Sequence, residues 1–303
     1  MVVLQQMCVF FILMGVGLLA RKTHVVDEEM LPRLSALIVK VCGPALIVSG
    51  ALDAGERIAA HEVASAFAVL GLLTLAMAGA ALVVPRLLRY PRKMHGLVNF
   101  GFWMTNIGYI GMPFVASVWG SRAMLYVTFY LIINNAMLYS YGIALASKGA
   151  PDRPRFNARM LVNPGNVATI LTIVIYFAAL PIPEVIAEPV RMMGSATAPL
   201  AMILVGAQMA DVKLASLLDA RLGLFIILKM LAFPAVALLA LKPFVADPML
   251  MGACLAVVAM PTGVLVGAFA QLYNPQLAPE ASKLVGATTL VAVLTIPLVA
   301  LVL

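Results

Sequence analysis

Two apolar segments of the chain are interrupted by proline, and they lie about half a chain apart. The first reads Asn106-Ile-Gly-Tyr-Ile-Gly-Met-Pro113, and the second begins Met260-Pro-Thr-Gly263. Both lie in stretches long enough to cross a bilayer, where a helix satisfies its backbone groups internally. A proline removes one helical hydrogen bond and crowds the carbonyl four residues back. Each segment therefore predicts a break whose freed backbone groups need partners from protein, water or ligand.

The composition around these breaks is that of a polytopic membrane protein. Hydrophobic residues make up 63% of the chain and charged residues 11%, whereas soluble domains are about 45–50% apolar and about 25% charged. Since each span needs roughly 20 residues, 303 residues leave room for about ten spans. We expect these spans near residues 3–20, 34–52, 63–85, 96–119, 121–147, 161–180, 191–210, 221–243, 249–272 and 281–303.

The basic residues predict how the spans are oriented. Of the 20 lysines and arginines, 14 fall in loops on one side of the spans and four in loops on the other. An excess of this kind marks the cytoplasmic side, so we expect a multi-pass protein of the cytoplasmic (inner) membrane with both termini outside. Because loop placement accounts for the net charge of +7, this charge does not indicate a nucleic-acid partner.

Five spans in each half place the two halves in opposite orientations, which is the topology of an inverted repeat. Two pairs of prolines support a duplication, since Pro44 and Pro199 lie 155 residues apart and Pro113 and Pro261 lie 148 apart. The alternative is that proline is simply frequent in membrane helices. The predicted fold is an all-α polytopic membrane protein of ten transmembrane helices in two inverted five-helix repeats, with helices 4 and 9 broken and crossing. Its parts are a first repeat over 1–147, a basic cytoplasmic linker over 148–160 and a second repeat over 161–303.

Few ionisable groups fall within the predicted spans, and this restricts the chemistry. All 13 carboxylates lie at span ends or in loops, so the sequence offers no clear buried proton carrier of the kind that many proton symporters use. The three cysteines have no paired spacing, and the three histidines lie near loops. We therefore expect no metal, no cofactor and no catalytic residues.

The candidate site consists of amides, a hydroxyl, a cation and the helix ends at the two breaks. Half-helix N-termini carry partial positive charge and glycines permit close crossing, so such a site suits the carboxylate of a small organic anion. Lys229 lies about eight residues, roughly 12 Å, beyond Arg221 in the eighth span; it either lines a cavity or extends to the interface. The amides of the fifth span either line the site or hydrogen-bond between helices. The predicted substrate-binding residues are Asn106, Gly108, Gly111, Pro113, Asn134, Asn135, Lys229, Pro261 and Thr262.

Several short segments, taken in order along the chain, resemble the auxin efflux carrier family of permeases in its bacterial form. They include the two breaks and Lys229 followed by Pro234, and together they cover nearly the whole chain. The remaining matching segments are Gly15-Val-Gly-Leu-Leu-Ala-Arg-Lys22, Pro44-Ala-Leu-Ile, Leu161-Val-Asn-Pro164, Ala198-Pro-Leu-Ala and Gly206-Ala-Gln-Met.

The resemblance implies ten helices in two inverted five-helix repeats, with the broken helices 4 and 9 crossing at Pro113 and Pro261. It also implies alternating access by an elevator-like movement, and organic anions such as dicarboxylates (malonate, malate) or indole acids as substrates. Bile-acid sodium symporters share this architecture, but their sodium-binding acidic residues have no clear counterpart in the predicted spans.

Together these patterns favour a secondary transporter or facilitator that moves a small organic anion through a site at the two breaks. A sodium-coupled symporter stays open as an alternative, and so does a membrane receptor or assembly subunit that binds a ligand without moving it. An intramembrane enzyme ranks last because the predicted spans hold no buried acid–base pair. The lipid bilayer is the other expected partner, and a homodimer is a candidate oligomeric state.

Overall fold

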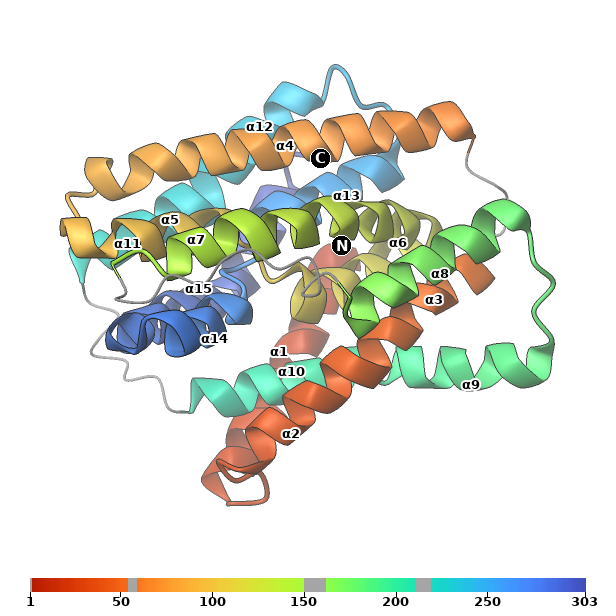
Figure 1. Cartoon of the computed structure of the whole chain (residues 1–303), viewed down its shortest axis with the longest axis horizontal. Coiled ribbons are helices and arrows are strands. Elements are labelled where there is room, and N and C mark those ends of the chain that lie inside the picture. The colour runs from red at the N-terminus through yellow and green to blue at the C-terminus, as the bar shows by residue number, and fades with distance from the viewer. Residues whose placement is uncertain (1, 54–58, 150–161, 211–218) are drawn as a thin grey trace.

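The computed structural model describes residues 2–53, 59–149, 162–210 and 219–303. Within these ranges every regular element is a helix, and the one strand-like feature is an isolated bridge between Thr105 and Thr262 (Figure 1). The all-α prediction is confirmed for this part of the chain. Most of the linker predicted over 148–160 lies outside the described residues.

The described part of the first half contains α-helices with short π-helical or 3-10 segments between some of them. In chain order the elements are α1 (Val2–Lys22), α2 (Met30–Leu37), η1 (Ile38–Cys42), α3 (Gly43–Leu52), α4 (Ala60–Leu87), η2 (Arg92–Met94), α5 (His95–Trp103), η3 (Ile107–Gly111), α6 (Met112–Met137), η4 (Leu138–Gly142) and α7 (Ile143–Ala146).

The second half begins after the linker and has the same general make-up. Its elements are α8 (Pro164–Ala178), α9 (Glu184–Ser195), α10 (Thr197–Met209), α11 (Ala220–Ile227), η7 (Leu228–Ala232), α12 (Phe233–Leu241), α13 (Pro248–Ala259), α14 (Val264–Tyr273), η8 (Pro275–Leu277) and α15 (Ala278–Ala300).

Seven helical stretches among the described residues are long and apolar enough to cross a membrane, and α8, α13 and α14 are shorter apolar helices. The longest stretch covers 40 residues, Ile107–Ala146, which is about twice the length of one span. It reverses at Gly120, whose φ of 76° is open to glycine and strained for other residues. The chain therefore turns where the sequence predicted one span to end at 119 and the next to begin at 121.

The structure separates two kinds of proline that the sequence pattern treated alike. Pro261 lies in an open break between α13 and α14, as predicted, but Pro113 lies in the first turn of α6, directly after the π-helical turn η3. Pro44 and Pro234 likewise follow π-helical turns, η1 and η7. A π-helical turn shifts the backbone bonding by one residue, so the proline ring is accommodated without interrupting the span. The prediction that Pro113 itself breaks the fourth span is therefore wrong. The break lies at residues 104–106, and it includes Asn106, which was predicted to open it.

The helices pack as two groups. The first, which we call the panel group, contains α1, α2 with α3, α8, and α9 with α10; α1 runs along α10, and α3 runs along α8 and α9. The second, the crossover group, contains α4 to α7 and α11 to α15, in which α4 packs on α5, α6 on α13, and α14 on α15. Figure 1 shows α2 and α10 at the lower left beside α14 and α15, where the two groups meet.

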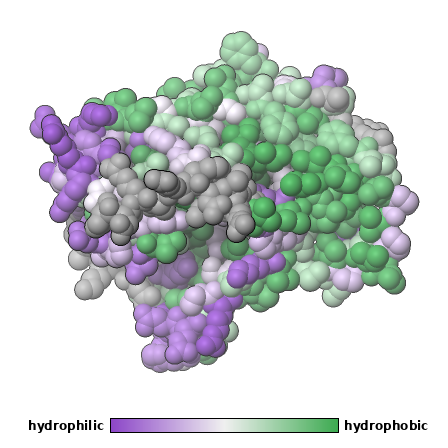
Figure 2. All heavy atoms as spheres, in the orientation of Figure 1, coloured by the Kyte–Doolittle hydropathy of each residue, from purple (hydrophilic) through white to green (hydrophobic). Residues whose placement is uncertain are grey.

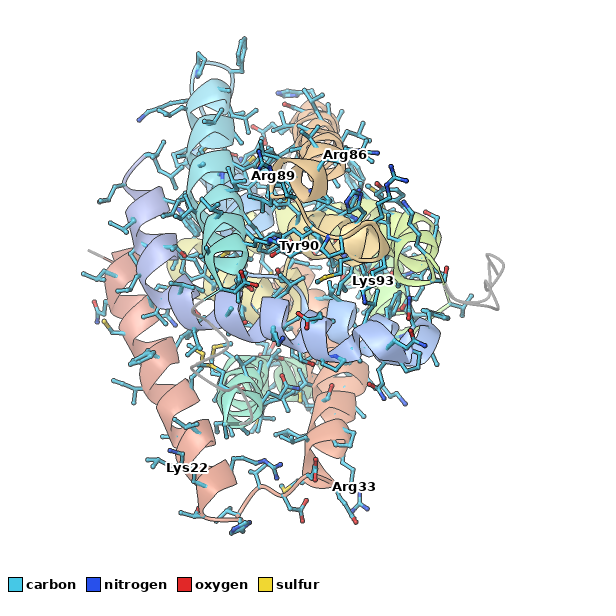
Figure 3. The ribbon with its side chains drawn as sticks, turned by 90° about the vertical axis from the view of Figure 1, so that its left-hand side faces the viewer. Lys22, Arg33, Arg86, Arg89, Tyr90 and Lys93 are labelled. Carbon is cyan, nitrogen blue, oxygen red and sulfur yellow. The ribbon has the colours of Figure 1, made fainter. Side chains whose placement is uncertain are left out.

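The outer surface is divided between apolar and charged regions. In Figure 2, hydrophobic residues cover much of the right of the molecule, and hydrophilic residues gather at the left and lower left. Figure 3 views this left-hand end and labels Lys22 and Arg33, beside the connection from α1 to α2, and Arg86, Arg89 and Lys93, around the connection from α4 to α5. Basic residues from connections far apart in sequence therefore share one end of the molecule.

Candidate functional site

The two interrupted helices meet at their breaks. The first break separates α5, which ends at Trp103, from η3, which begins at Ile107. The second separates α13, which ends at Ala259, from α14, which begins at Val264. We call residues 104–106 and 260–263, which lie between these ends, the crossover.

The two segments of the crossover, 104–106 and 260–263, pair through their backbones. Thr105 and Thr262 form an antiparallel bridge. The amide N–H of Asn106 donates to the carbonyl of Pro261 at 2.8 Å, and the amide of Gly263 donates to the carbonyl of Met104 at 2.9 Å. The polar groups that the two breaks release are thus partly satisfied by each other, as a protein at membrane depth requires.

Two side chains cap the end of α5, and a third supports one of them. The hydroxyl of Thr262 donates to the carbonyl of Gly101 at 2.8 Å, and the ammonium of Lys229 on η7 donates to the carbonyl of Phe102 at 2.6 Å. Thr288 on α15 accepts a hydrogen bond from the amide of Thr262 at 3.0 Å. The last carbonyls of a helix lack intrahelical partners, so these contacts satisfy groups that would otherwise be buried and unpaired.

Two buried polar side-chain atoms of the crossover, the hydroxyl of Thr105 and the amide nitrogen of Asn106, have no hydrogen-bond partner within the described residues. The Asn106 residue is only 2% exposed, so water does not reach the unpaired N–H groups of its side-chain amide. An unsatisfied buried donor costs about 1–3 kcal/mol. The crossover therefore carries a donor that a ligand acceptor could satisfy.

The other predicted site residues divide into two sets. Gly108 is exposed with open space where a side chain would lie, and Gly111 packs closely against Met260 of the second break. These lie beside the crossover, whereas the two asparagines of α6 lie elsewhere: Asn134 accepts from the hydroxyl of Tyr130 at 3.3 Å, and Asn135 donates to Asn166 on α8.

A cavity of about 590 Å³ lies where the panel group meets the crossover group. None of the nine predicted residues lines it, but Tyr109 and Val264, which closely follow the two breaks, do. Its polar lining also includes Ser35 on α2, Gln208 on α10 and Lys283 on α15. The hydroxyls of Ser35 and Tyr109 lie 2.8 Å apart and hydrogen-bond across the boundary between the groups. This cavity is within the size range of small-molecule sites, about 300–1,000 Å³.

The described residues that line the cavity include one cation. Lys283 is the lining cation, and it forms an ion pair of 2.8 Å with Glu280 one turn earlier on α15. No carboxylate is among the described residues that line the cavity, and the rest of the lining is hydroxyls, the Gln208 amide and apolar groups. Such a lining can hold an anionic group beside an apolar body.

Sequence reasoning missed Ser35, Tyr109 and Lys283 as candidates. Each is an ordinary residue in its local context, because Lys283 reads as a lone cation at the start of the last predicted span and Ser35 as part of a span end. The one available signal was Gln208, an amide within an otherwise apolar stretch, where an unpaired polar group is costly.

Comparison with known proteins adds the family to this geometry. Residues 2–300 match the family described as membrane transport protein. No curated protein matched the chain. The match covers nearly the whole chain, including both breaks and every cavity-lining residue. The chain therefore belongs to this family of membrane transport proteins, the auxin efflux carrier family.

Proposed function

We propose that this transporter moves a small organic anion across the cytoplasmic membrane, and that the cavity beside the crossover receives the substrate. The observation that carries this proposal is the lining of the cavity, which combines Lys283 with hydroxyl and amide groups and contains no carboxylate among the described residues. A buried or half-buried anion needs positive charge and hydrogen-bond donors, which Lys283 and the neighbouring polar groups can supply.

The crossover supplies further groups for the same substrate. The unpartnered amide of Asn106 can donate to a carboxylate. The starts of η3 and α14 present backbone N–H groups and the positive ends of their dipoles beside the cavity-lining residues Tyr109 and Val264. In this proposal the carboxylate lies toward the crossover or Lys283, and the apolar part of the substrate lies against the valine, leucine and methionine lining.

The pairing at the crossover supports two inverted repeats. Residues 104, 105 and 106 lie 157 positions before residues 261, 262 and 263. With this spacing the hydrogen bond from Asn106 to Pro261 has its equivalent in the bond from Gly263 to Met104, and Thr105 pairs with its own equivalent, Thr262. The spacing agrees with the 155 residues between Pro44 and Pro199. We therefore assign ten transmembrane helices to two five-helix repeats, 1–147 and 161–303.

The two packed groups suggest how alternating access occurs. The cavity lies on their boundary, and the hydrogen bond between Ser35 and Tyr109 crosses it. Movement of the crossover group against the panel group would carry the substrate past this boundary, as in transporters that rock one bundle against another. The basic end shown in Figure 3 is the cytoplasmic end in this proposal, with both termini outside.

The test is uptake into proteoliposomes made with the purified protein, using a panel of radiolabelled carboxylates such as malonate, malate and an indole acid. We expect saturable uptake of at least one of them. Lys283→Gln should raise the apparent KM at least tenfold, because it removes the positive charge of the cavity. Lys93→Gln is the matched control, since Lys93 is an exposed residue at the same end of the molecule and does not line the cavity.

Two results would count against the proposal. Saturable binding without any flux would favour a receptor or assembly subunit. Unchanged transport in both Asn106→Ala and Thr262→Ala would remove the crossover from the substrate site.

A further inference from the structure

Lys229 occupies an unusual position at the end of a broken helix. It lies on η7, its side chain is fully buried, and its ammonium is 2.6 Å from the carbonyl oxygen of Phe102. This carbonyl is one of the last in α5, where the helix dipole concentrates negative partial charge equivalent to roughly half an electron. The ammonium therefore sits where the field of α5 favours a cation.

The surroundings of Lys229 hold the ammonium without a carboxylate. The described residues give it no ion pair, and its one hydrogen-bond acceptor among them is the Phe102 carbonyl. The centroid of the Phe102 ring lies 5.8 Å from the ammonium. The same ring makes edge-to-face contacts with Phe225 and Phe233, which lie one turn before and one turn after Lys229. A carbonyl dipole and a ring face are the kinds of group that stabilise a desolvated cation.

A cap alone would not require a cation. On the adjacent residue of α5, the neutral hydroxyl of Thr262 satisfies the carbonyl of Gly101. Burying an ammonium costs several kcal/mol before any compensation. The position 157 residues earlier is Leu72, an exposed residue of α4, so this cation belongs to one half of the chain and is not a feature of both repeats.

We infer that the ammonium of Lys229 is a tethered cation that fills a monovalent-cation site at the crossover. In transporters with broken helices, the C-terminal ends of half-helices and unwound carbonyls can coordinate Na⁺ or H⁺. Here the end of α5 offers such a carbonyl, and the chain supplies the cation itself. One consequence rests on the proposed function: uptake of the organic anion does not depend on sodium.

The first experiment needs no substrate. Lys229→Ala removes the four terminal heavy atoms of the side chain, which n-propylammonium reproduces. Thermal unfolding of the purified variant in detergent is measured with n-propylammonium chloride, sodium chloride or tetramethylammonium chloride at equal ionic strength. We expect n-propylammonium to raise Tm by about 2–4 °C at ten times its Kd. Tetramethylammonium, which has the charge but no N–H donor, should give no rise.

The controls use the same cations. The intact protein should not respond, because Lys229 already fills the site. Lys40→Ala should not respond either: Lys40 also lies in a π-helical turn, η1, but its side chain is exposed. The inference is overturned if n-propylammonium raises the Tm of Lys229→Ala no more than tetramethylammonium does, or if Lys40→Ala responds equally.

A second set of variants separates the charge from the hydrogen bond, and it applies even where Lys229→Ala does not fold. Lys229→Gln keeps N–H donors without the charge, and Lys229→Met removes both. We expect each to lower the uptake rate in proteoliposomes at least tenfold, and we expect uptake by the intact protein to be equal in sodium and choline buffers. Uptake by Lys229→Gln equal to that of the intact protein, or a sodium requirement in the intact protein, would overturn the inference. Absence of uptake in the intact protein would instead refute the proposed function, and the thermal experiment would still decide the role of Lys229.

Discussion

The close crossing of α1 and α10 in the panel group leads to a sharp prediction about stability. A Cβ added at Gly206 would lie 1.9 Å from the carbonyl oxygen of Met14, and one added at Gly17 would lie 2.0 Å from that of Ile203. Both obstacles are backbone atoms, so no side-chain rotation can relieve them. Ordinary van der Waals contact begins at about 3.4 Å. Gly206→Ala or Gly17→Ala would therefore force α1 and α10 about 1.5 Å further apart.

The size of the effect follows from the dispersion energy that this separation removes. A gap of about 0.5–1 Å already forfeits about a quarter to a half of the attraction between two atoms. We take about 40 atom pairs across the crossing of α1 and α10, each contributing about 0.15 kcal/mol of dispersion energy. If each pair loses half of this attraction, the total loss is about 3 kcal/mol. The higher helix propensity of alanine returns at most about 1 kcal/mol. We therefore expect Gly206→Ala to destabilise the protein by about 2–3 kcal/mol, which lowers Tm by about 3–5 °C.

The assay is thermal unfolding of the purified protein in detergent. Gly15→Ala is the matched control, because Gly15 also lies on α1 but a Cβ there would meet nothing within 4 Å. It should leave Tm unchanged or raise it. The double variant Gly17→Ala/Gly206→Ala should cost less than the two single effects combined, since one separation of the helices relieves both clashes. A Tm for Gly206→Ala equal to that of Gly15→Ala would refute the reasoning.

Four further substitutions test the crossover group. Gly252→Ala should lower stability by about 1–3 kcal/mol in the same thermal assay, because its Cβ would lie 2.6 Å from the ring of Trp119. Pro113→Ala should leave uptake within twofold, whereas Pro261→Ala should lower it at least tenfold, because only Pro261 lies in an open break; equal effects would contradict this difference. Asn135→Ala should leave the apparent KM for substrate unchanged in uptake assays, because the Asn135 amide pairs with an asparagine of α8 and does not line the cavity.

The helical class and the approximate spans could be predicted because hydrocarbon imposes simple rules. A chain at membrane depth must satisfy its backbone within helices, so length and apolarity locate most spans. The boundary between the spans predicted at 96–119 and 121–147 followed from span length, and the structure places Gly120, with its positive φ, at this boundary.

The break in the first interrupted helix was placed wrongly for a physical reason. Proline lacks an N–H wherever it lies, but a preceding π-helical turn can absorb the lost bond within a continuous span. Pro44, Pro113 and Pro234 all follow such turns. Both true breaks contain threonine followed by asparagine or glycine, Thr105-Asn106 and Thr262-Gly263, and only the second also contains a proline, Pro261. Polar side chains beside a backbone interruption are therefore a better signal than proline alone.

The cavity could not be predicted because its residues come from α2, η3, α10, α14 and α15. No local pattern links a serine near residue 35 with a lysine near residue 283. Their meeting depends on how the panel group packs against the crossover group, which is a tertiary property. Periodicity and composition describe single helices and carry little information about such a boundary.

The two polar groups that sequence reasoning treated as equivalent site candidates have opposite roles in the structure. The ammonium of Lys229 is committed to the Phe102 carbonyl, so it cannot also neutralise a substrate without releasing the end of α5. The amide of Asn106 has a free donor and no competing partner in the described residues. In the proposed function, the substrate carboxylate therefore finds its compensating charge at Lys283 or at the helix ends beside the cavity, while Lys229 holds the crossover in shape. The two proposals thus assign different roles to the two lysines. Removal of Lys229 should lower the stability of the crossover, and removal of Lys283 should lower the affinity for substrate.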